Sequence, residues 1–325
     1  MAAGNISGRN RNREGQISHA HQNRIAIIGN RWPASMIPAD PIFPASLHAA
    51  DKVNLFLHIT GRRDDGYHTL ESGVVFTAFG DRITIDRAAT DEICITGPSA
   101  NILRDDGSTN ICAACLDGFR EAGGAFEPVR VMIEKNIPVG AGLGGGSADA
   151  AALLRYLNQH TLSPLSSDAL HQLALRLGAD VPVCLNMAPA RMEGMGEIIS
   201  PLAIRNAGPI LLANPGTALA TGDVFRSLTG AEVTGRQQNP VHALDGTNPY
   251  QLTRHGNDLQ APACRLMPEI ADLLTTLAAQ NGADAVGMSG SGATCFAIYS
   301  SQTACEAAAS ELLAKNIWAV ATKII

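Results

Sequence analysis

The chain has 325 residues, of which 46% are hydrophobic and 17% are charged. That length exceeds what one compact core usually holds, and that composition excludes a wholly disordered chain, so two domains are predicted. The net charge of −6 argues against a nucleic-acid-binding protein, and no apolar run approaches the roughly 20 residues of a membrane helix. We expect a soluble protein with no nucleic-acid or membrane partner; the sequence leaves its oligomeric state open.

The seven cysteines are odd in number, and most lie in apolar stretches such as Ile93–Ile95. This usage is typical of reduced thiols in a protein core and predicts a cytoplasmic protein. Cys112 and Cys115 form a CxxC pair in an alanine-rich helical stretch. Because no second CxxC or histidine pair follows at zinc spacing, we interpret both residues as core thiols.

Residues 1 to about 45 differ in composition from the rest of the chain. They are rich in Asn, Arg and Gly, and several prolines follow between Pro33 and Pro44. The basic residues are not followed by the apolar segment of a secretory signal. We interpret residues 1–45 as a disordered tail or as the product of a start codon placed too far upstream, with a targeting segment as the alternative.

The first half of the ordered chain is predicted to begin at Asp51 and to mix strands with helices. Alternating apolar residues indicate the strands, and capping residues and glycines indicate the ends of the helices, with Ser108 as one expected cap. Strands are expected over residues 52–60, 72–79, 81–86, 92–97 and 129–134, and helices over 108–122, 147–159 and 167–177.

The second half is predicted to start near Pro209. Pro262 and Pro268 are expected to break a mostly helical segment. Strands are expected over residues 210–213, 285–288, 294–299 and 318–324, and helices over 258–279 and 302–315. Because strands and helices do not alternate regularly, we predict an α+β fold, with domains over residues 46–205 and 206–325.

Residues 140–147 read GAGLGGGS, between an expected strand and a helix expected to open at Ser147. Glycines let the backbone adopt positive φ and approach a ligand closely, and the free N–H groups at a helix start attract phosphate. Three better-known phosphate loops fit poorly. The second parallel strand of a dinucleotide fold is missing, Gly146 stands where a P-loop has lysine, and protein-kinase motifs do not follow.

The stretch PVGAGLGGGSADAA, residues 138–151, resembles the second motif of the GHMP kinase superfamily. KVNLFLHI at residues 52–59, followed by DGYHTL at 65–70, resembles the first motif, and GMSGSGATCF at 287–296 resembles the third. The triple glycine before Ser147 is similar to the branch of this superfamily that phosphorylates 4-diphosphocytidyl-2-C-methyl-D-erythritol. The resemblance runs from about Ala49 to the end of the chain.

This resemblance implies a two-domain GHMP-kinase-like fold with the active site in the interdomain cleft. It implies ATP and Mg²⁺ as cofactors, and as substrate a cytidine-diphosphate-linked polyol that is phosphorylated on its 2-hydroxyl in the non-mevalonate route to isoprenoid precursors. The alternatives are another GHMP kinase, of homoserine or mevalonate type, and a non-catalytic nucleotide-binding protein on the same fold. The implied ATP-binding residues are Pro138, Gly140, Ala141, Gly142, Leu143, Gly144, Gly145, Gly146 and Ser147.

Lys52 and Asp180 are the implied catalytic residues. By the resemblance, Asp180 is the general base that faces the accepting hydroxyl, and Lys52 places its ammonium near the γ-phosphate. The alternative for Asp180 is a helix-capping aspartate, and for Lys52 an exposed strand residue. Asn54 shares the face of Lys52 at period two, which suits a substrate contact. Ser147 lies either near Mg²⁺ or at a helix cap, and we predict no dedicated metal ligand.

The cytidine end of the substrate is assigned to scarce aromatic residues. The resemblance implies that Tyr67 and Phe225 sandwich the cytosine and that His68 hydrogen-bonds to its edge; core packing is the alternative for Phe225. The third-motif residues assigned to the substrate are Gly290, Ser291 and Gly292.

One position departs from the family pattern. The family usually has Pro-Ala before the first-motif lysine, and this chain has Ala50-Asp51. We expect the Asp51 carboxylate to alter the charge environment of Lys52 or to form a surface ion pair.

Overall fold

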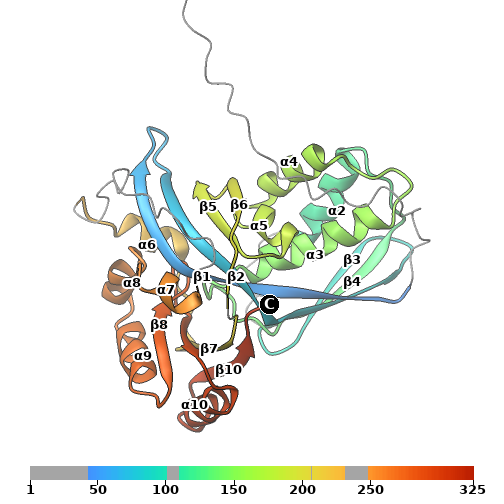
Figure 1. The fold of residues 1–325 in the computed structure, drawn as a ribbon. Helices are drawn as coiled ribbons and strands as arrows, with labels where there is room; N and C mark the ends of the chain where they lie inside the picture. The colour runs from blue at the N-terminus through green and yellow to red at the C-terminus, as the bar shows by residue number, and fades with distance from the viewer. Residues whose placement is uncertain (1–42, 101–109, 206, 231–247) are drawn as a thin grey trace, which may run out of the picture. The chain divides into compact units, whose positions relative to one another are not determined.

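The computed structural model describes residues 43–100, 110–205, 207–230 and 248–325. Residues 1–42 and the expected cap Ser108 lie outside these ranges. The described residues combine two β-sheets with helices (Figure 1). The α+β prediction is therefore confirmed.

The first sheet is built on a long antiparallel hairpin. Its strands β1 and β2 pair from Ala45 opposite Ile85 to Arg62 opposite His68. β4 pairs with the C-terminal half of β2 and β5 with its N-terminal half, and β3 and β6 extend the two edges. The strands are β1 (Ala45–Arg62), β2 (His68–Arg87), β3 (Glu92–Thr96), β4 (Val129–Glu134), β5 (Ala190–Gly194) and β6 (Ile198–Pro201).

The predicted break between strands 72–79 and 81–86 is wrong, because β2 is continuous through Gly80. A Cβ on Gly80 would lie 2.2 Å from the backbone oxygen of Ala49. The glycine therefore lets the paired strands β1 and β2 approach closely rather than ending β2. β1 is also longer than predicted, because residues before Asp51 pair with β2.

Helices of the first half are α2 (Ile111–Glu121), α3 (Gly145–Gln159), α4 (Ser167–Leu177) and α5 (Val181–Asn186). The side chain of Asn110 caps α2 by accepting a hydrogen bond from Cys112 N. α3 begins two residues before the predicted Ser147, since Gly144 at φ 66° is its N-cap. The short helix α5 and strands β5 and β6 were not predicted.

The second sheet is antiparallel, in the order β10-β7-β9-β8. Pro268 separates α8 from α9 as predicted, but Pro262 lies in the first turn of α8, where a missing N–H costs little. The elements are β7 (Pro209–Asn214), α6 (Thr221–Arg226), α7 (Pro249–Thr253), α8 (Gln260–Leu266), α9 (Glu269–Ala278), β8 (Ala283–Met288), β9 (Cys295–Tyr299), α10 (Gln302–Ala314) and β10 (Trp318–Lys323).

Three buried hydrophobic clusters stabilise the fold. One lies between the first sheet and α2–α5, and a second lies between the second sheet and α8–α10. The third takes Val53 and Phe56 from β1, and Leu212 and Phe296 from the second sheet, so it joins the two sheets. This packing holds β1 rigidly where its polar residues reach the glycine loops.

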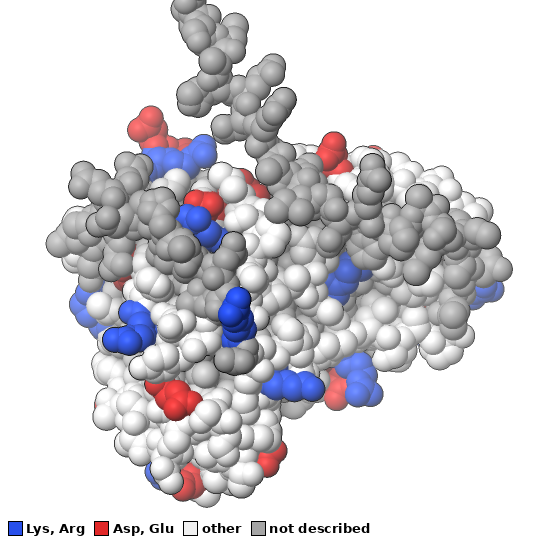
Figure 2. Space-filling view, viewed as in Figure 1, with Lys and Arg blue, Asp and Glu red and all other residues white. Residues whose placement is uncertain are grey.

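All seven cysteines are unpaired, and five are buried, including Cys112 and Cys115. The interpretation of the CxxC pair as core thiols is confirmed. Within the described ranges, no helix is both long and apolar enough to cross a membrane. Basic and acidic side chains are interspersed on the face shown in Figure 2.

Candidate active site

A pocket of about 1790 Å³ collects residues from both halves of the chain. Ligand pockets for a single drug-sized molecule usually measure roughly 300–1,000 Å³, so this one has room for two nucleotide-sized ligands. With one exception, the residues predicted for the site line it: Lys52, Asn54, Tyr67, His68, Pro138, Gly140, Ala141, Gly142, Leu143, Gly144, Gly145, Gly146, Ser147, Asp180, Phe225, Gly290 and Ser291.

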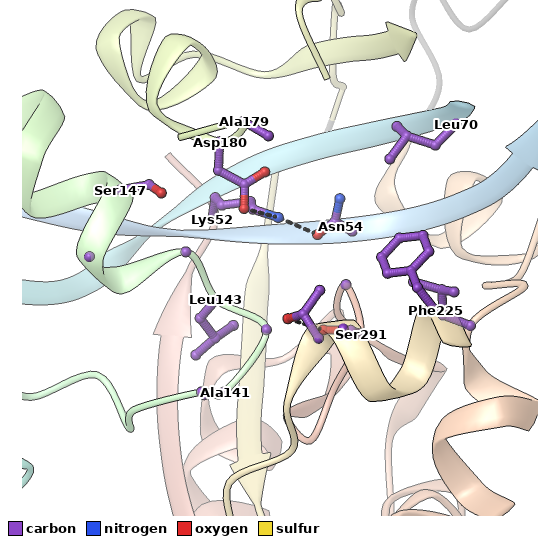
Figure 3. Close-up of a pocket in the computed structure, with 18 of the residues that line it drawn as sticks. Lys52, Asn54, Leu70, Ala141, Leu143, Ser147, Ala179, Asp180, Phe225 and Ser291 are labelled. Atoms are coloured by element: carbon purple, nitrogen blue, oxygen red, sulfur yellow. Dashed lines mark hydrogen bonds and ion pairs between the residues drawn. The ribbon is translucent and has the colours of Figure 1, made fainter. Parts of the chain in front are cut away.

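Lys52 and Asp180 meet in the middle of this pocket. The Lys52 Nζ lies 3.2 Å from Asp180 Oδ2 and donates a hydrogen bond of 2.7 Å to Asn54 Oδ1 (Figure 3). Lys52 and Asn54 extend from the same face of β1, as their spacing of two predicts. Their side chains are nearly inaccessible, whereas 33% of the Asp180 side chain remains exposed.

Asp180 occupies the N-cap position of α5, but its side chain makes no capping hydrogen bond there. The carboxylate therefore faces Lys52 and the pocket rather than the helix backbone. The local reason is the sequence Gly178-Ala179-Asp180-Val181-Pro182, where a glycine ends α4 and a proline in the first turn starts α5. Asp180 is therefore a helix-capping residue by its backbone position only, because its side chain contacts Lys52 instead of the helix N–H groups.

The first glycine loop has three left-handed glycines before α3, namely Gly140 at φ 66°, Gly142 at φ 75° and Gly144 at φ 66°. The Lys52 N–H donates a 3.0 Å hydrogen bond to Leu143 O, so the loop is attached to β1 beside the lysine side chain. Gly145 and Gly146 then open α3, with their N–H groups in the unpaired first turn. This arrangement suits a phosphate group next to Lys52.

Ser147 is the third residue of α3 and not its cap. Figure 3 shows its side chain on the first turn of the helix, on the side of Asp180. No group of three or more His, Cys, Asp or Glu residues in the described part of the chain could hold a metal ion.

The second glycine loop packs directly on the first. Ser289 Oγ donates a 3.0 Å hydrogen bond to Gly142 O, and Thr294 N donates one of 3.1 Å to Ala141 O. Gly292 is the exception among the predicted residues. A Cβ there would meet Met288 Sδ at 3.0 Å and Ile270 Cδ1 at 3.4 Å, and Gly292 does not line this pocket. Its assignment as a substrate residue stays a prediction.

At one end of the pocket the rings of His68 and Phe225 stack, with centroids 5.4 Å apart and planes at 29°. Burial, and to a smaller degree the charge of Arg62, lowers the pKa of His68, which favours a neutral ring. Tyr67 is 67% exposed, and among the described residues its ring contacts no other aromatic ring. The sandwich of Tyr67 and Phe225 therefore stays a prediction. Phe225 also packs against the second hydrophobic cluster, so core packing, the alternative interpretation of this residue, describes part of its contacts.

Sequence reasoning missed several polar residues around the site. Thr221, at the start of α6, shares a 2.8 Å hydrogen bond with Ser291. Lys135 lines the pocket and forms buried ion pairs with Asp81 and Asp149 behind the glycine loop. The sequence offered one signal for Lys135, Asp81 and Asp149, which is a charged residue within an otherwise apolar stretch. Such residues are rarely buried unless they are paired.

Asp51 is fully buried, and the surface ion pair expected for it is wrong. The Thr77 hydroxyl donates a 2.5 Å hydrogen bond to its Oδ1, and its Oδ2 has no hydrogen-bond partner within the described residues. Burial raises the pKa of Asp51 to about 7. The residue lies in an irregular part of the β1–β2 pairing, between Ala50 and Lys52, where the strand has no regular partner position.

Comparisons with known proteins identify the family. Residues 110–187 match the family model for the GHMP kinases N terminal domain, and residues 246–317 match GHMP kinases C terminal. The chain is 44% identical over 278 residues to 4-diphosphocytidyl-2-C-methyl-D-erythritol kinase of Brucella abortus, covering 82% of this chain and 90% of that protein. The Agrobacterium fabrum kinase of the same name is 43% identical over 275 residues, covering 82% and 91%.

A solved structure agrees with these sequence matches. The crystal structure of a 4-(cytidine 5'-diphospho)-2C-methyl-D-erythritol kinase superposes with a TM-score of 0.71 at 32% identity, covering 86% of this chain and 99% of that one. The fold, the paired glycine loops and the relatives agree. The chain therefore belongs to the GHMP kinase family and is a small-molecule kinase.

Proposed function

We propose that this kinase transfers the γ-phosphate of ATP to the 2-hydroxyl of 4-diphosphocytidyl-2-C-methyl-D-erythritol. It would thereby act in the non-mevalonate, or methylerythritol phosphate, route to isoprenoid precursors. The observation that carries the proposal is the position of the Lys52–Asp180 pair, between a phosphate-type glycine loop and an aromatic end in one pocket. The names of the relatives support the same acceptor.

In this proposal the two substrates enter the pocket from opposite ends. The ATP phosphates lie on the glycine loop and the first turn of α3, where unpaired N–H groups are available. The cytosine lies at the end formed by Tyr67, His68 and Phe225, and the polyol reaches toward Asp180. We place this pocket between domains of residues 46–205 and 206–325, because it takes residues from both.

The chemistry needs one proton acceptor and positive charge at the transferred phosphoryl group. Asp180 Oδ2 accepts the proton of the attacking hydroxyl. Lys52 donates two of its three N–H bonds to Asn54 and Asp180, and its third has no partner among the described residues, so it can be donated to the γ-phosphate. Lys52 also keeps Asp180 aligned with the acceptor.

Mg²⁺ is implied by phosphoryl transfer from ATP, and the residues present fit an ion held mainly by phosphate oxygens. Ser147, on the first turn of α3, and the partly exposed Asp180 carboxylate are the protein oxygens that would lie near it. When bound, Mg²⁺ would neutralise phosphate charge.

Two other functions are less well supported. Homoserine and mevalonate are much smaller than a nucleotide-linked polyol and would leave the His68–Phe225 end of the pocket empty. A non-catalytic nucleotide-binding protein has no need for a buried lysine paired with a carboxylate beside a phosphate loop. The chain has both groups.

The test is a coupled assay of ADP release with 4-diphosphocytidyl-2-C-methyl-D-erythritol, homoserine and mevalonate offered separately. We expect turnover with the cytidylyl substrate alone, and mass spectrometry with phosphorus NMR should place one new phosphate on the 2-hydroxyl. Equal or faster turnover of homoserine or mevalonate would contradict the assignment. The absence of ADP release with every acceptor would favour the non-catalytic alternative.

We also propose a cytoplasmic location. Seven unpaired cysteines, five of them buried, fit a reducing compartment. Thiol labelling of the unfolded protein, isolated from cells under conditions that block exchange, should find seven free thiols. Recovery of disulfide-linked pairs would argue for an oxidising compartment.

A further inference from the structure

Ser72 lies on β2 and is fully buried. Its hydroxyl makes two hydrogen bonds. One joins its Oγ to the backbone oxygen of Phe56 at 2.6 Å, and the other joins it to the side-chain Nδ2 of Asn54 at 2.8 Å. Ser72 does not line the pocket, so it cannot touch either substrate.

The direction of these two bonds follows from the number of protons. A carbonyl oxygen has no proton to give, so the single proton of Ser72 must be donated to Phe56 O. The Ser72 oxygen can then only accept, and it accepts from the NH₂ end of the Asn54 amide. The oxygen end of that amide must therefore face the other way, toward Lys52 Nζ at 2.7 Å.

The backbone of Asn54 is fixed as well. Its N–H donates a 3.1 Å hydrogen bond to Ser289 Oγ, which in turn donates to Gly142 O. The remaining freedom of Asn54 is rotation of its amide, and that rotation would point NH₂ at the Lys52 ammonium. The NH₂ group of Asn54 and the Lys52 ammonium, both donors, would then face each other in a buried site. This arrangement is destabilising, because neither donor would have an acceptor there.

From this geometry we infer that Ser72 is a positioning residue for phosphoryl transfer, an inference that rests on the proposed function. By fixing the Asn54 amide, it directs one Lys52 proton to Asn54 and a second to Asp180, and so leaves the third for the γ-phosphate. Ser72 thus acts on the chemical step through Asn54 and Lys52, without contacting ATP or the acceptor.

The variant Ser72→Ala tests this role. Because a hydrogen bond to a charged network is lost, we expect kcat to fall about 10- to 100-fold. The KM values for ATP and acceptor should stay within about threefold, since Lys52 acts mainly in the transition state. Ser72→Thr keeps the hydroxyl and should restore most of kcat.

Thr161→Val is the matched control for a buried hydroxyl. Thr161 Oγ1 also donates to a backbone carbonyl, that of Ala125, and accepts from a nitrogen, Ser163 N at 3.1 Å. It is buried but does not line the pocket. Thr161→Val should lower the melting temperature while leaving kcat unchanged. An equal fall of kcat in both variants would mean that Ser72 is only structural.

A double-mutant cycle with Asn54→Ala then tests the route of the effect. If Ser72 acts through Asn54, Ser72→Ala should cost no further activity in the Asn54→Ala background. Additive losses would overturn the inference. If the native enzyme prefers another acceptor, the proposed function fails but the cycle is run with that acceptor. A crystal structure of Ser72→Ala tests the inference independently of activity. An unchanged orientation of the Asn54 amide together with an unchanged Lys52–Asp180 distance would overturn the inference.

Discussion

Asp51 and Lys52 are neighbours on β1, but their side chains have different surroundings. Lys52 has two oxygen partners and faces the pocket, whereas Asp51 is buried with one oxygen unpartnered. Burial raises the Asp51 pKa from an ordinary value of 3.8 to about 7. The folded state therefore binds this proton more tightly than the unfolded state does. The resulting stability is fully present below pH 3.8 and is lost as the pH rises through about 7.

We expect Asp51→Asn to remove this pH dependence, because the amide keeps the shape of the protonated acid. The free energy of unfolding of the variant should exceed that of the native chain at pH 8, by an amount on the order of 1–4 kcal/mol. The two should differ little near pH 4. Urea unfolding across this range measures the difference. A constant offset between the two proteins at every pH would show that Asp51 does not titrate in this window.

Asp180→Asn tests the assignment of the general base. The amide keeps the size of the carboxylate but cannot accept the proton, so we expect kcat to fall at least ~100-fold. The acceptor KM should change little, because the loss concerns the transition state. Asp284→Asn, on the exposed part of β8, is the control and should retain full activity. Near-native turnover of Asp180→Asn would assign the carboxylate a structural role.

Removal of the Phe225 ring tests the cytosine end. Phe225→Ala should weaken acceptor binding by ~1–3 kcal/mol, or roughly 5- to 150-fold, through loss of one stacking face. His68→Ala should have a similar effect on acceptor KM, and neither should alter the KM for ATP. Because Phe225 also packs on the second core, Phe225→Leu serves as the control that keeps apolar volume without a flat ring. Weakened ATP binding with unchanged acceptor KM would disprove cytosine recognition here.

At the scale of elements, the two glycine loops meet backbone to backbone. A Cβ on Gly142 would lie 2.4 Å from Ser289 O and 2.7 Å from Gly292 O, and Gly142 has a left-handed φ of 75°. A side chain on Gly146 would have its nearest neighbour at 3.7 Å, and Gly146 needs no positive φ. Gly142 is therefore required by the packing and backbone conformation of the loop, whereas neither of these explains the glycine at position 146.

Gly142→Ala and Gly146→Ala should therefore differ in their effect on stability. We expect Gly142→Ala to lose at least ~2 kcal/mol of stability, since both the left-handed backbone and the steric clash oppose it. Gly146→Ala lies in the first turn of α3 and should be as stable as the native chain or up to ~1 kcal/mol more stable. Its KM for ATP should rise, because the methyl group enters the pocket. Equal melting temperatures of both variants would contradict the close packing of the loops.

For the whole molecule, the described core begins at Phe43. Its ring packs against the first core, and the Arg87 guanidinium lies 5.2 Å from its centroid. Ala45 then starts the pairing of β1 with β2. Phe43 and Ala45 therefore belong to the packed part of the chain, although both fall in the segment 1–45 that was expected to be a tail.

Deletion of residues 1–42 should leave kcat and melting temperature nearly unchanged, because their composition is poor in residues that build a core. The control deletion of residues 1–50 also removes the first third of β1 and should lower the melting temperature strongly. Differential scanning calorimetry and the ADP-release assay measure both effects. A large loss on removing residues 1–42 alone would show that they stabilise the enzyme.

The sequence by itself determined the local parts of this enzyme. Sequence patterns located β4 and α4 with the bounds that the structure has, and the glycine pattern located the loop that leads into α3. Lys52 and Asp180 were assigned through the resemblance to the GHMP kinase motifs, and Asn54 through its spacing of two residues from Lys52 on the same strand. These features depend on neighbours a few residues apart, which is the range over which backbone conformation is set.

Only the tertiary structure decided how those parts meet. Gly292 belongs to the third motif but does not line the pocket, and Asp51 is the sequence neighbour of Lys52 yet is fully buried. Ser72, in the middle of a strand, carries no local signal of its role, because its partners Asn54 and Phe56 lie on another strand. Burial and hydrogen-bond direction arise from residues distant in the chain, so no short stretch of sequence contains them.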